Sequence, residues 1–198
     1  MSDHCAAIVL AAGASTRLGQ PKQLLKLNGE TLLHRTVRLA TETGCAPIFV
    51  VLGFNADQMQ PEIRDLPAKT VINPEWQSGM GSSLRSGVEA LMKATPQPKK
   101  ILVLLCDQPT LSTEILSTLL QASVNAKPLI TASSYAGRFG VPAIFDKQLY
   151  SDLLKLEGDQ GARSVIQRYI HQTATVEFPG GIVDIDTPAD LTNLTANK

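Results

Sequence analysis

The stretch that decides the fold reads Ile8-Val9-Leu10-Ala11-Ala12-Gly13-Ala14-Ser15-Thr16-Arg17-Leu18-Gly19-Gln20-Pro21-Lys22. Its first part, continued back to Ala6, has no charge and no turn residue, so we expect a central strand, Ala6 to Ala12, buried on both faces. The chain then changes to small residues, whose short side chains let backbone N–H groups approach a ligand closely. In α/β sheets, ligands bind where a strand ends in such a turn.

The turn after this strand also carries two cations, Arg17 and Lys22. Successive backbone amides in a turn bind anions, and the two side chains add full positive charges. This combination suits a polyphosphate, so we predict a nucleoside triphosphate site. The alternative is that Gly13 and Gly19 only form a turn and that both cations are solvated. The nucleotide contacts expected in this segment are Leu10, Ala11, Ala12, Gly13, Ser15, Arg17 and Lys22.

Two well-known phosphate loops are excluded by spacing. A Walker loop needs four residues between its glycines and then a lysine, whereas five residues separate Gly13 from Gly19 and Gln20 follows. The dinucleotide fingerprint needs three glycines, and only these two are present in the loop. The missing third glycine, together with the lack of an acidic residue at the end of the second strand, also argues against a dehydrogenase.

Composition limits the class of protein. With 198 residues and a formal net charge of zero, the chain fits one domain, residues 1–198. Balanced charge argues against nucleic acid or an anionic membrane as the main partner. No apolar run approaches the ~20 residues of a membrane span, and the first residues lack the pattern of a secretory signal. The three cysteines lack metal-ligand spacing, which favours reduced thiols and a cytoplasmic location.

Strands and helices alternate along the chain, so we predict an α/β fold with an open, mostly parallel sheet and helices on both faces. Further strands are expected at 47–53, 69–72 and 100–105, and helices at 30–43, 82–94 and 112–124, with a short helix interrupted at Pro61 over 57–65. Segments 129–132 and 141–145 are strands without room for a helix between them, which makes the sheet mixed. Beyond them we expect helices at 147–156, 160–172 and 188–196, and short extended segments at 175–177 and 181–184.

Three further polar segments follow predicted strands or open helices. In the small-residue turn 77–84, Gly79, Gly81 and Ser82 are expected to contact the nucleoside, although the same residues also fit an ordinary capped helix start. Asp107 directly follows an apolar strand, where a charge is costly unless it is paired or binds a metal. In segment 183–190, the alternation of side chains along an extended chain places Asp184 and Asp186 on the same side of the chain.

These carboxylates predict a metal site. Mg²⁺ takes one or two protein carboxylates together with phosphates and waters, a need that Asp107 and Asp186 meet; Mn²⁺ is the other candidate ion. Asp184 is the alternative to Asp186 as the second ligand. If no metal binds, the alternative is that Asp107 pairs with Arg17 or Lys22.

These segments together resemble the MobA-like nucleotidyltransferases. The resemblance is carried by Leu10-Ala11-Ala12-Gly13-x-Ser15-x-Arg17-x-Gly19-x-x-Lys22, by the Gly-Met-Gly-Ser-Ser turn, by Asp107-Gln108-Pro109 and by Asp-Ile-Asp-Thr-Pro. Within that family the chain is similar to the molybdenum cofactor cytidylyltransferases, through Ala11-Ala12-Gly13, Gly140 to Phe145 and Gly158 to Arg163. The similarity runs roughly from Ala7 to Leu191.

The resemblance implies a Rossmann-like nucleotidyltransferase fold and the transfer of CMP from CTP to molybdopterin cofactor, with loss of pyrophosphate. Residues up to about 110 would bind the nucleotide, and the remainder would bind the acceptor and supply the second metal ligand. Arg17, Lys22 and Asp107 would be catalytic, and a molybdenum hydroxylase is a candidate recipient of the product. The expected acceptor contacts are Gly140, Val141, Pro142 and Arg163. The alternatives are transfer to a sugar or alcohol phosphate, and a non-catalytic cofactor carrier.

Overall fold

The computed structural model describes residues 5–125, 127–185 and 190. Its main sheet has seven strands in the order β5-β4-β1-β6-β8-β7-β9. Neighbouring strands are parallel except that β8 runs antiparallel to both β6 and β7. The strands are β1 (Cys5–Leu10), β4 (Ile48–Leu52), β5 (Ala68–Ile72), β6 (Lys100–Leu105), β7 (Ile130–Tyr135), β8 (Arg138–Asp146) and β9 (Thr173–Glu177).

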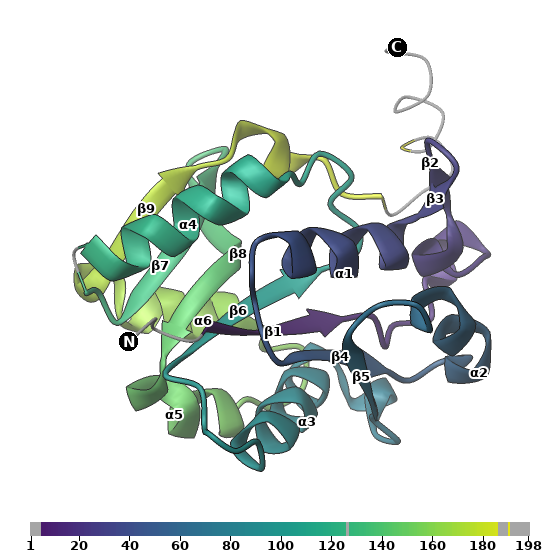
Figure 1. Ribbon diagram of the computed structural model, residues 1–198, viewed down its shortest axis with the longest axis horizontal. Coiled ribbons are helices and arrows are strands. Elements are labelled where there is room, and N and C mark those ends of the chain that lie inside the picture. Colours follow the sequence, from purple (N-terminus) through teal and green to yellow (C-terminus); the bar gives the residue numbers. More distant parts are fainter. Residues whose placement is uncertain (1–4, 126, 186–189, 191–198) are drawn as a thin grey trace.

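Helices cover both faces of this sheet (Figure 1). One face carries α1 (Leu32–Glu42) and α4 (Thr113–Asn125), and the other carries α3 (Met80–Met92), α5 (Tyr150–Leu154) and α6 (Ala162–Arg168). The predicted three-layer, mostly parallel α/β fold is therefore confirmed. The helix predicted at 57–65 is divided near Pro61 into α2 (Ala56–Met59) and a 3-10 turn, Gln60–Ile63. None of the described helices is long and apolar enough to cross a membrane.

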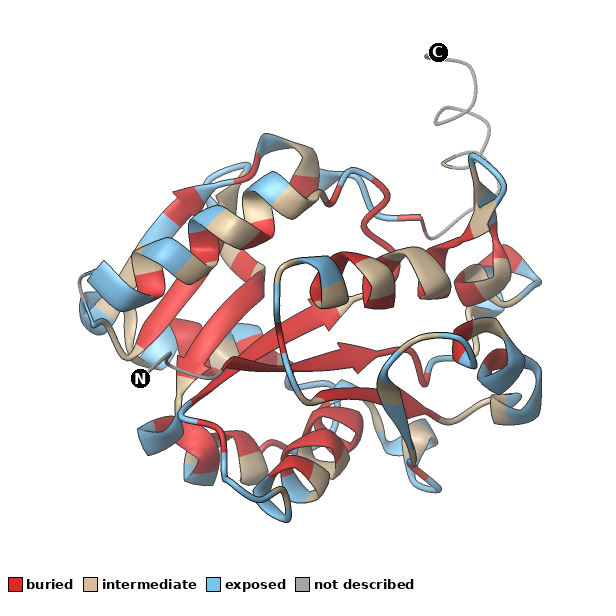
Figure 2. Ribbon diagram, viewed as in Figure 1, coloured by how far each residue is buried: buried red, intermediate tan, exposed pale blue. Residues whose placement is uncertain are grey.

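The first strand lies at the centre of the core, as its sequence predicts. All six residues of β1 are buried (Figure 2). Ala7 and Val9 belong to the core cluster that includes residues of α1 and α4, whereas Ile8 and Leu10 belong to the cluster that includes residues of α3 and α5, because side chains alternate along a strand. The strand ends at Leu10, two residues earlier than predicted.

The strand order reverses at the end of β1. From β1 the chain goes to β4 and β5 on one side and then returns to β6 on the other side. Such a switch point leaves a crevice at the carboxyl ends of the two central strands, where open α/β sheets bind their ligands. The crevice therefore lies where Gly13 and Asp107 follow β1 and β6.

The segment 129–146 confirms the prediction of two strands without an intervening helix. β7 and β8 form an antiparallel hairpin that turns at Ala136 and Gly137, both with positive φ. A second, smaller hairpin of β2 (Lys26–Leu27) and β3 (Glu30–Thr31) turns at Asn28 and Gly29 and was not expected. The pair Asn-Gly is the strongest short signal for such a turn, so the sequence did contain it.

The prediction of an extended segment at 181–184 is wrong. Residues Pro179–Ile182 form a 3-10 turn instead, and Ile182, Val183 and Asp184 are all exposed. Two glycines at 180 and 181 explain the difference, because they favour a turn over a strand. Gly181 and Ile185 are buried here, and the backbone N–H of Ile185 donates to the carbonyl of Asp107 at 3.1 Å.

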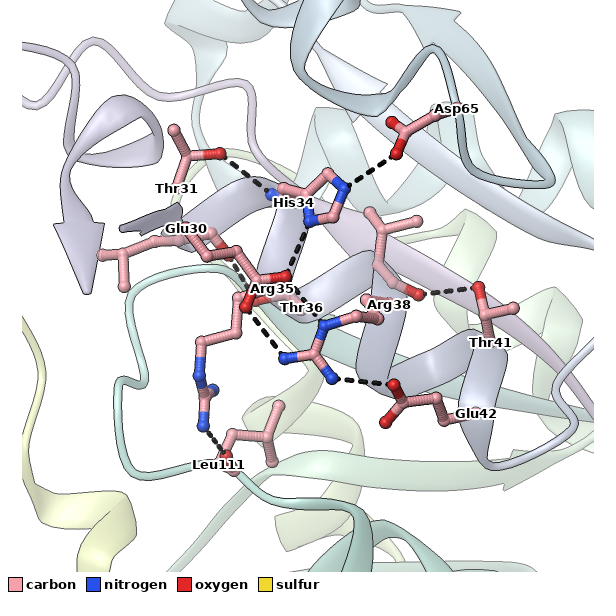
Figure 3. Close-up of polar contacts among 12 residues, drawn as sticks. Glu30, Thr31, His34, Arg35, Thr36, Arg38, Thr41, Glu42, Asp65 and Leu111 are labelled. Carbon is pink, nitrogen blue, oxygen red and sulfur yellow. Dashed lines mark hydrogen bonds and ion pairs between the residues drawn. The ribbon is translucent and has the colours of Figure 1, made fainter. Parts of the chain in front are cut away.

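A charged network stabilises the exposed start of α1 (Figure 3). Thr31 caps the helix by accepting a hydrogen bond from the backbone N–H of His34. His34 also contacts Glu30 at 2.6 Å and Asp65 at 3.3 Å, and Arg38 binds both carboxylate oxygens of Glu30 at 2.8 Å. The hydrogen bonds from Arg38, and then from His34, lower the pKa of Glu30 to about 2 against the opposing effect of burial. The network lies outside the crevice, so we assign it to the stability of α1 and not to ligand binding.

Candidate functional site

The crevice at the strand switch holds a cavity of about 400 Å³, a size typical of small-molecule sites. Most of the residues predicted to bind a nucleotide line it, and they come from both faces of the sheet. A larger hollow of about 520 Å³ lies beside α2 and β5 but contains no residue predicted for the site. The predicted residues that line the cavity are Leu10, Ala11, Ala12, Gly13, Ser15, Lys22, Gly79 and Asp107.

The first wall of the cavity is the loop after β1. The loop enters a left-handed conformation at Ser15, with φ of 53°, before a 3-10 turn at Thr16–Leu18. The Ser15 hydroxyl then accepts a hydrogen bond from the backbone N–H of Lys22 at 3.2 Å, which closes the loop on itself. Arg17 lies on the exposed side of this turn and is not among the lining residues.

Gln23 holds this loop in place and was missed by sequence reasoning. Its side-chain amide is buried and donates to the carbonyls of Ala11 at 2.9 Å and Gly13 at 2.8 Å. Its own carbonyl oxygen is also buried and accepts no hydrogen bond. A glutamine next to Lys22 gives no local signal of this role, because the partners are backbone atoms ten and twelve residues away.

Lys22 and Asp107 meet across the cavity. The Lys22 ammonium lies 2.5 Å from Oδ2 of Asp107, and the two side chains are 19% and 12% exposed. The predicted alternative, in which Asp107 pairs with Lys22, is thus the arrangement seen. Asp107 Oδ1 nevertheless stays buried without a hydrogen-bond donor.

The ion pair is largely buried and adjoins a buried thiol. Burial first, and the Asp107 charge second, raise the pKa of the adjacent Cys106 thiol to about 12. This thiol therefore stays protonated and neutral at physiological pH. Charges interact more strongly in such an environment than in water, so an anion that enters beside Lys22 would be held firmly.

The donor set at Asp107 fits a divalent cation that arrives with a nucleotide. A carboxylate oxygen that is buried and has no hydrogen-bond partner is costly to leave in that state, and Mg²⁺ or Mn²⁺ takes such hard oxygen ligands together with phosphate oxygens. Among the described residues, no three His, Cys, Asp or Glu side chains converge on one point. Asp186, the predicted second ligand, lies outside the described residues. Asp184 is described and exposed.

The second wall is the start of α3. Gly79 lines the cavity, whereas Gly81 and Ser82 are buried beneath it. The Ser82 hydroxyl accepts from the side-chain amide of Asn73 at 2.9 Å, and that amide also reaches Ser83 at 3.0 Å. The structure therefore gives Ser82 a part in fixing the helix start, and Asn73 is a second residue that sequence reasoning missed.

The turn after α5 packs on this wall. The Gly81 N–H donates to the carbonyl of Gly158 at 2.9 Å, and Asp159 lines the cavity next to Gly79. The sequence predicts that Arg163, the last residue of the segment Gly158 to Arg163, lies on the acceptor side. The first half of this segment instead reaches the nucleotide wall, because α5 and α6 pack on the same face of the sheet as α3.

The predicted acceptor residues lie beside Asp107 rather than in the same cavity. The Gln108 side-chain amide donates to the carbonyl of Val141 at 3.1 Å, so the segment 140–142 is tied to the residue after Asp107. Tyr135 joins this group by donating from its hydroxyl to the same carbonyl at 3.3 Å. A Cβ on Gly140 would lie 2.3 Å from the Tyr135 hydroxyl, so only glycine leaves room for that tyrosine.

Several charges act on the Tyr135 hydroxyl. Burial raises the pKa of Tyr135, and the charges of Asp184 and Asp107 raise it further, while Arg163 opposes them. These charges converge on Tyr135 from segments distant in the sequence. The role of Arg163, from α6, as an acceptor contact stays a prediction. Tyr135 itself was not expected in the site.

Comparison with known proteins agrees with this geometry. Residues 7–174 match the model of the MobA-like NTP transferase domain. A nicotine blue oxidoreductase from Paenarthrobacter nicotinovorans is 34% identical over 171 residues, which cover 81% of this chain and 80% of that protein. The molybdenum cofactor cytidylyltransferase of Escherichia coli strain K12 is 24% identical over 93% of this chain and 92% of its own length.

Solved structures show the same fold. The Mycobacterium tuberculosis Rv0371c homologue from Mycobacterium sp. strain JC1 has a TM-score of 0.81 and 30% identity, over 100% of this chain and 98% of its own. The manganese complex of Rv0371C from M. tuberculosis H37Rv has a TM-score of 0.77 and 26% identity, over 98% of this chain and 100% of its own. The family model spans most of the sequence and includes the loop after β1, Lys22 and Asp107. This chain belongs to the family of MobA-like NTP transferase domains.

Proposed function

We propose that the protein transfers CMP from CTP to a molybdopterin-type cofactor and releases pyrophosphate. A phosphate monoester oxygen on the acceptor forms a bond to the α-phosphorus, the bond to the β-phosphate breaks, and pyrophosphate leaves. The observation that carries this proposal is the Lys22–Asp107 pair at a cavity of nucleotide size in a chain of this family. Similarity to the E. coli cytidylyltransferase supports the choice of cofactor.

The residues of the chain supply positioning and charge. Nucleotidyl transfer needs no covalent protein nucleophile and depends on holding two anions in line. The loop from Ala11 to Ser15 would cradle the phosphates with backbone N–H groups. Lys22 would bind the α-phosphate and the incoming acceptor, and Arg17 would stabilise charge on the leaving pyrophosphate.

Asp107, with Asp186, would hold Mg²⁺ or Mn²⁺, which when bound would neutralise charge shared by the triphosphate and the acceptor phosphate. On the acceptor side, the cofactor would be bound by Gly140 to Pro142 and by Arg163. Arg163 would bind the phosphate of the cofactor. We assign nucleotide binding to residues up to about 110 and acceptor binding to the remainder. Location in the cytoplasm and transfer of the product to a molybdenum hydroxylase remain predictions.

A pyrophosphate-release assay tests the proposal. The protein is incubated with Mg²⁺ and each of the four nucleoside triphosphates, with and without molybdenum cofactor. We expect release with CTP that depends on the cofactor. If pyrophosphate release requires a sugar or alcohol phosphate instead, that compound is the acceptor and the molybdopterin-type cofactor is not. If no pyrophosphate is released with any acceptor, nucleotidyl transfer is contradicted.

A second candidate function follows from the relative named nicotine blue oxidoreductase, which is 34% identical to this chain. The chain would then catalyse a redox reaction on nicotine blue in the same cavity. Oxidation of added NADH or NADPH, followed by absorbance with and without nicotine blue, distinguishes the two. Dye-dependent oxidation without pyrophosphate release would favour this candidate.

A further inference from the structure

Asp159 is the one acidic lining residue of the cavity besides Asp107, within the described part of the chain. It belongs to the turn between α5 and α6, and its carboxylate makes no hydrogen bond or ion pair with another described residue. A carboxylate that lines a ligand cavity with both oxygens available is ready to accept hydrogen bonds from the ligand.

The position of Asp159 within the cavity fixes which part of a nucleotide it meets. Lys22 and Asp107 mark the phosphate end. Asp159 lies at the other wall, where its Oδ1 is 2.7 Å from the position that a Cβ on Gly79 would take. Trp76 and Met80 line the cavity at this wall too. Gly79 thus leaves room for the carboxylate.

The charge of Asp159 excludes the phosphates as its partner, because two anions repel each other. Its partner must be a donor on the nucleoside, either a ribose hydroxyl or an amino group of the base. The ribose lies next to the phosphates in every nucleotide, whereas Asp159 lies beside Gly79, on the wall formed by the start of α3. The apolar parts of Trp76 and Met80 are suited to a flat base.

We infer that Asp159 selects the base by accepting a hydrogen bond from its exocyclic amino group, so that cytosine is preferred over uracil. This inference rests on the proposed nucleotide site. Uracil presents a carbonyl oxygen where cytosine presents an amino group, and a carboxylate cannot donate a hydrogen bond to that oxygen. The Asp159 carboxylate and the uracil carbonyl oxygen would then face each other without a hydrogen between them. The cost of leaving both without a hydrogen-bond donor disfavours binding of UTP.

Calorimetric titration with the magnesium complexes of CTP, UTP and dCTP tests this inference without any acceptor. We expect the wild-type protein to bind CTP at least about tenfold more tightly than UTP, as for one charged hydrogen bond. The side-chain amide of Asp159→Asn can accept a hydrogen bond from cytosine or donate one to uracil. The preference of this variant for CTP over UTP should therefore fall to within about threefold. Glu157→Gln removes a charge from the same turn outside the cavity and should keep the wild-type ratio.

Melting curves without nucleotide check that the variants fold, since residues 157 and 159 are both exposed. An unchanged CTP-to-UTP ratio in Asp159→Asn would overturn the inference, as would a change in the CTP-to-dCTP ratio instead, which would assign Asp159 to the ribose. Absence of binding of every nucleotide by the wild-type protein would overturn the proposed function as well. Discrimination by Asp159 without pyrophosphate release in the earlier assay would contradict only the transfer reaction.

Discussion

The ammonium group of Lys22 lies 2.5 Å from Oδ2 of Asp107, although 85 residues separate them in the chain. The two residues follow β1 and β6, which are adjacent and parallel, so the sheet itself brings them together. The pair prepares the cavity for a polyphosphate, because Lys22 is held toward it while Asp107 Oδ1 has no hydrogen-bond partner. Each member can be tested separately.

Replacing Lys22 by methionine should lower kcat/KM for pyrophosphate release by about 10²–10³, by analogy with the loss of one preorganised charge stabiliser. Methionine keeps much of the apolar length of the side chain and removes only its charge. Steady-state kinetics with CTP measure the effect, and Lys26→Met, an exposed lysine in β2, serves as the control. An unchanged kcat/KM in Lys22→Met would remove this residue from the mechanism.

Replacing Gln23 by alanine should loosen the loop after β1. The change leaves the carbonyls of Ala11 and Gly13 without their buried donor, which we expect to cost about 1–3 kcal/mol of unfolding free energy. CTP binding should weaken in parallel. Urea unfolding and titration with CTP measure the two effects, with exposed Gln20→Ala as the control. Equal unfolding midpoints for the two variants would contradict this role of Gln23.

Gly140→Ala should impair use of the acceptor and leave binding of CTP unchanged. The added Cβ would lie 2.3 Å from the Tyr135 hydroxyl oxygen, so the tyrosine must move away from Val141 and Gln108. We expect an increased KM for the acceptor with an unaltered Kd for CTP. The double variant with Tyr135→Phe removes the nearest clashing atom and should recover part of the loss. If the double variant is no better than Gly140→Ala, the clash is not the cause.

The network on α1 predicts a pH dependence of stability. Burial lowers the pKa of His34, but hydrogen bonds to Glu30 and Asp65 outweigh it, so the pKa is raised above 6.5. A raised pKa in the folded state stabilises the protein below about pH 6.5 and ceases to do so as pH rises through the folded value. The wild-type protein should therefore lose unfolding free energy as pH rises from about 6.5 through the raised pKa of His34, relative to His34→Gln. Urea unfolding across this range measures the difference, and parallel curves for the two proteins would contradict it.

Much of the fold follows from local patterns in the sequence. β1, β4 and β6 are apolar runs bounded by turn residues, and α1 has both a Thr31 cap and Gly44 after its end, so their positions could be predicted. The segment 181–184 could not, because its apolar residues Ile182 and Val183 are exposed at the end of a 3-10 turn and directly after it. Apolar character alone does not distinguish a strand from an exposed turn.

The site could be predicted where chemistry is local and not where it depends on contacts. Asp107 stands out because a charge close after a buried strand needs a partner, and Lys22 stands out as a cation in the small-residue loop that follows β1. Gln23 and Tyr135 do not, because their roles depend on carbonyls supplied by distant segments. Asp159 lies in the segment Gly158 to Arg163, which carries part of the family resemblance. Its place at the nucleotide wall follows only from the packing of α5 and α6 beside α3.

Pyrophosphate release by Asp107→Ala tests the central claim most directly, since this residue links the ion pair, the predicted cation and the acceptor segment. The assay uses CTP, magnesium and molybdenum cofactor, with melting curves to check the fold and the exposed Glu89→Ala as the control. We predict that the rate falls by about 10²–10³ in Asp107→Ala, while the control keeps the wild-type rate. A folded Asp107→Ala variant that retains more than about a tenth of the wild-type rate would contradict the account.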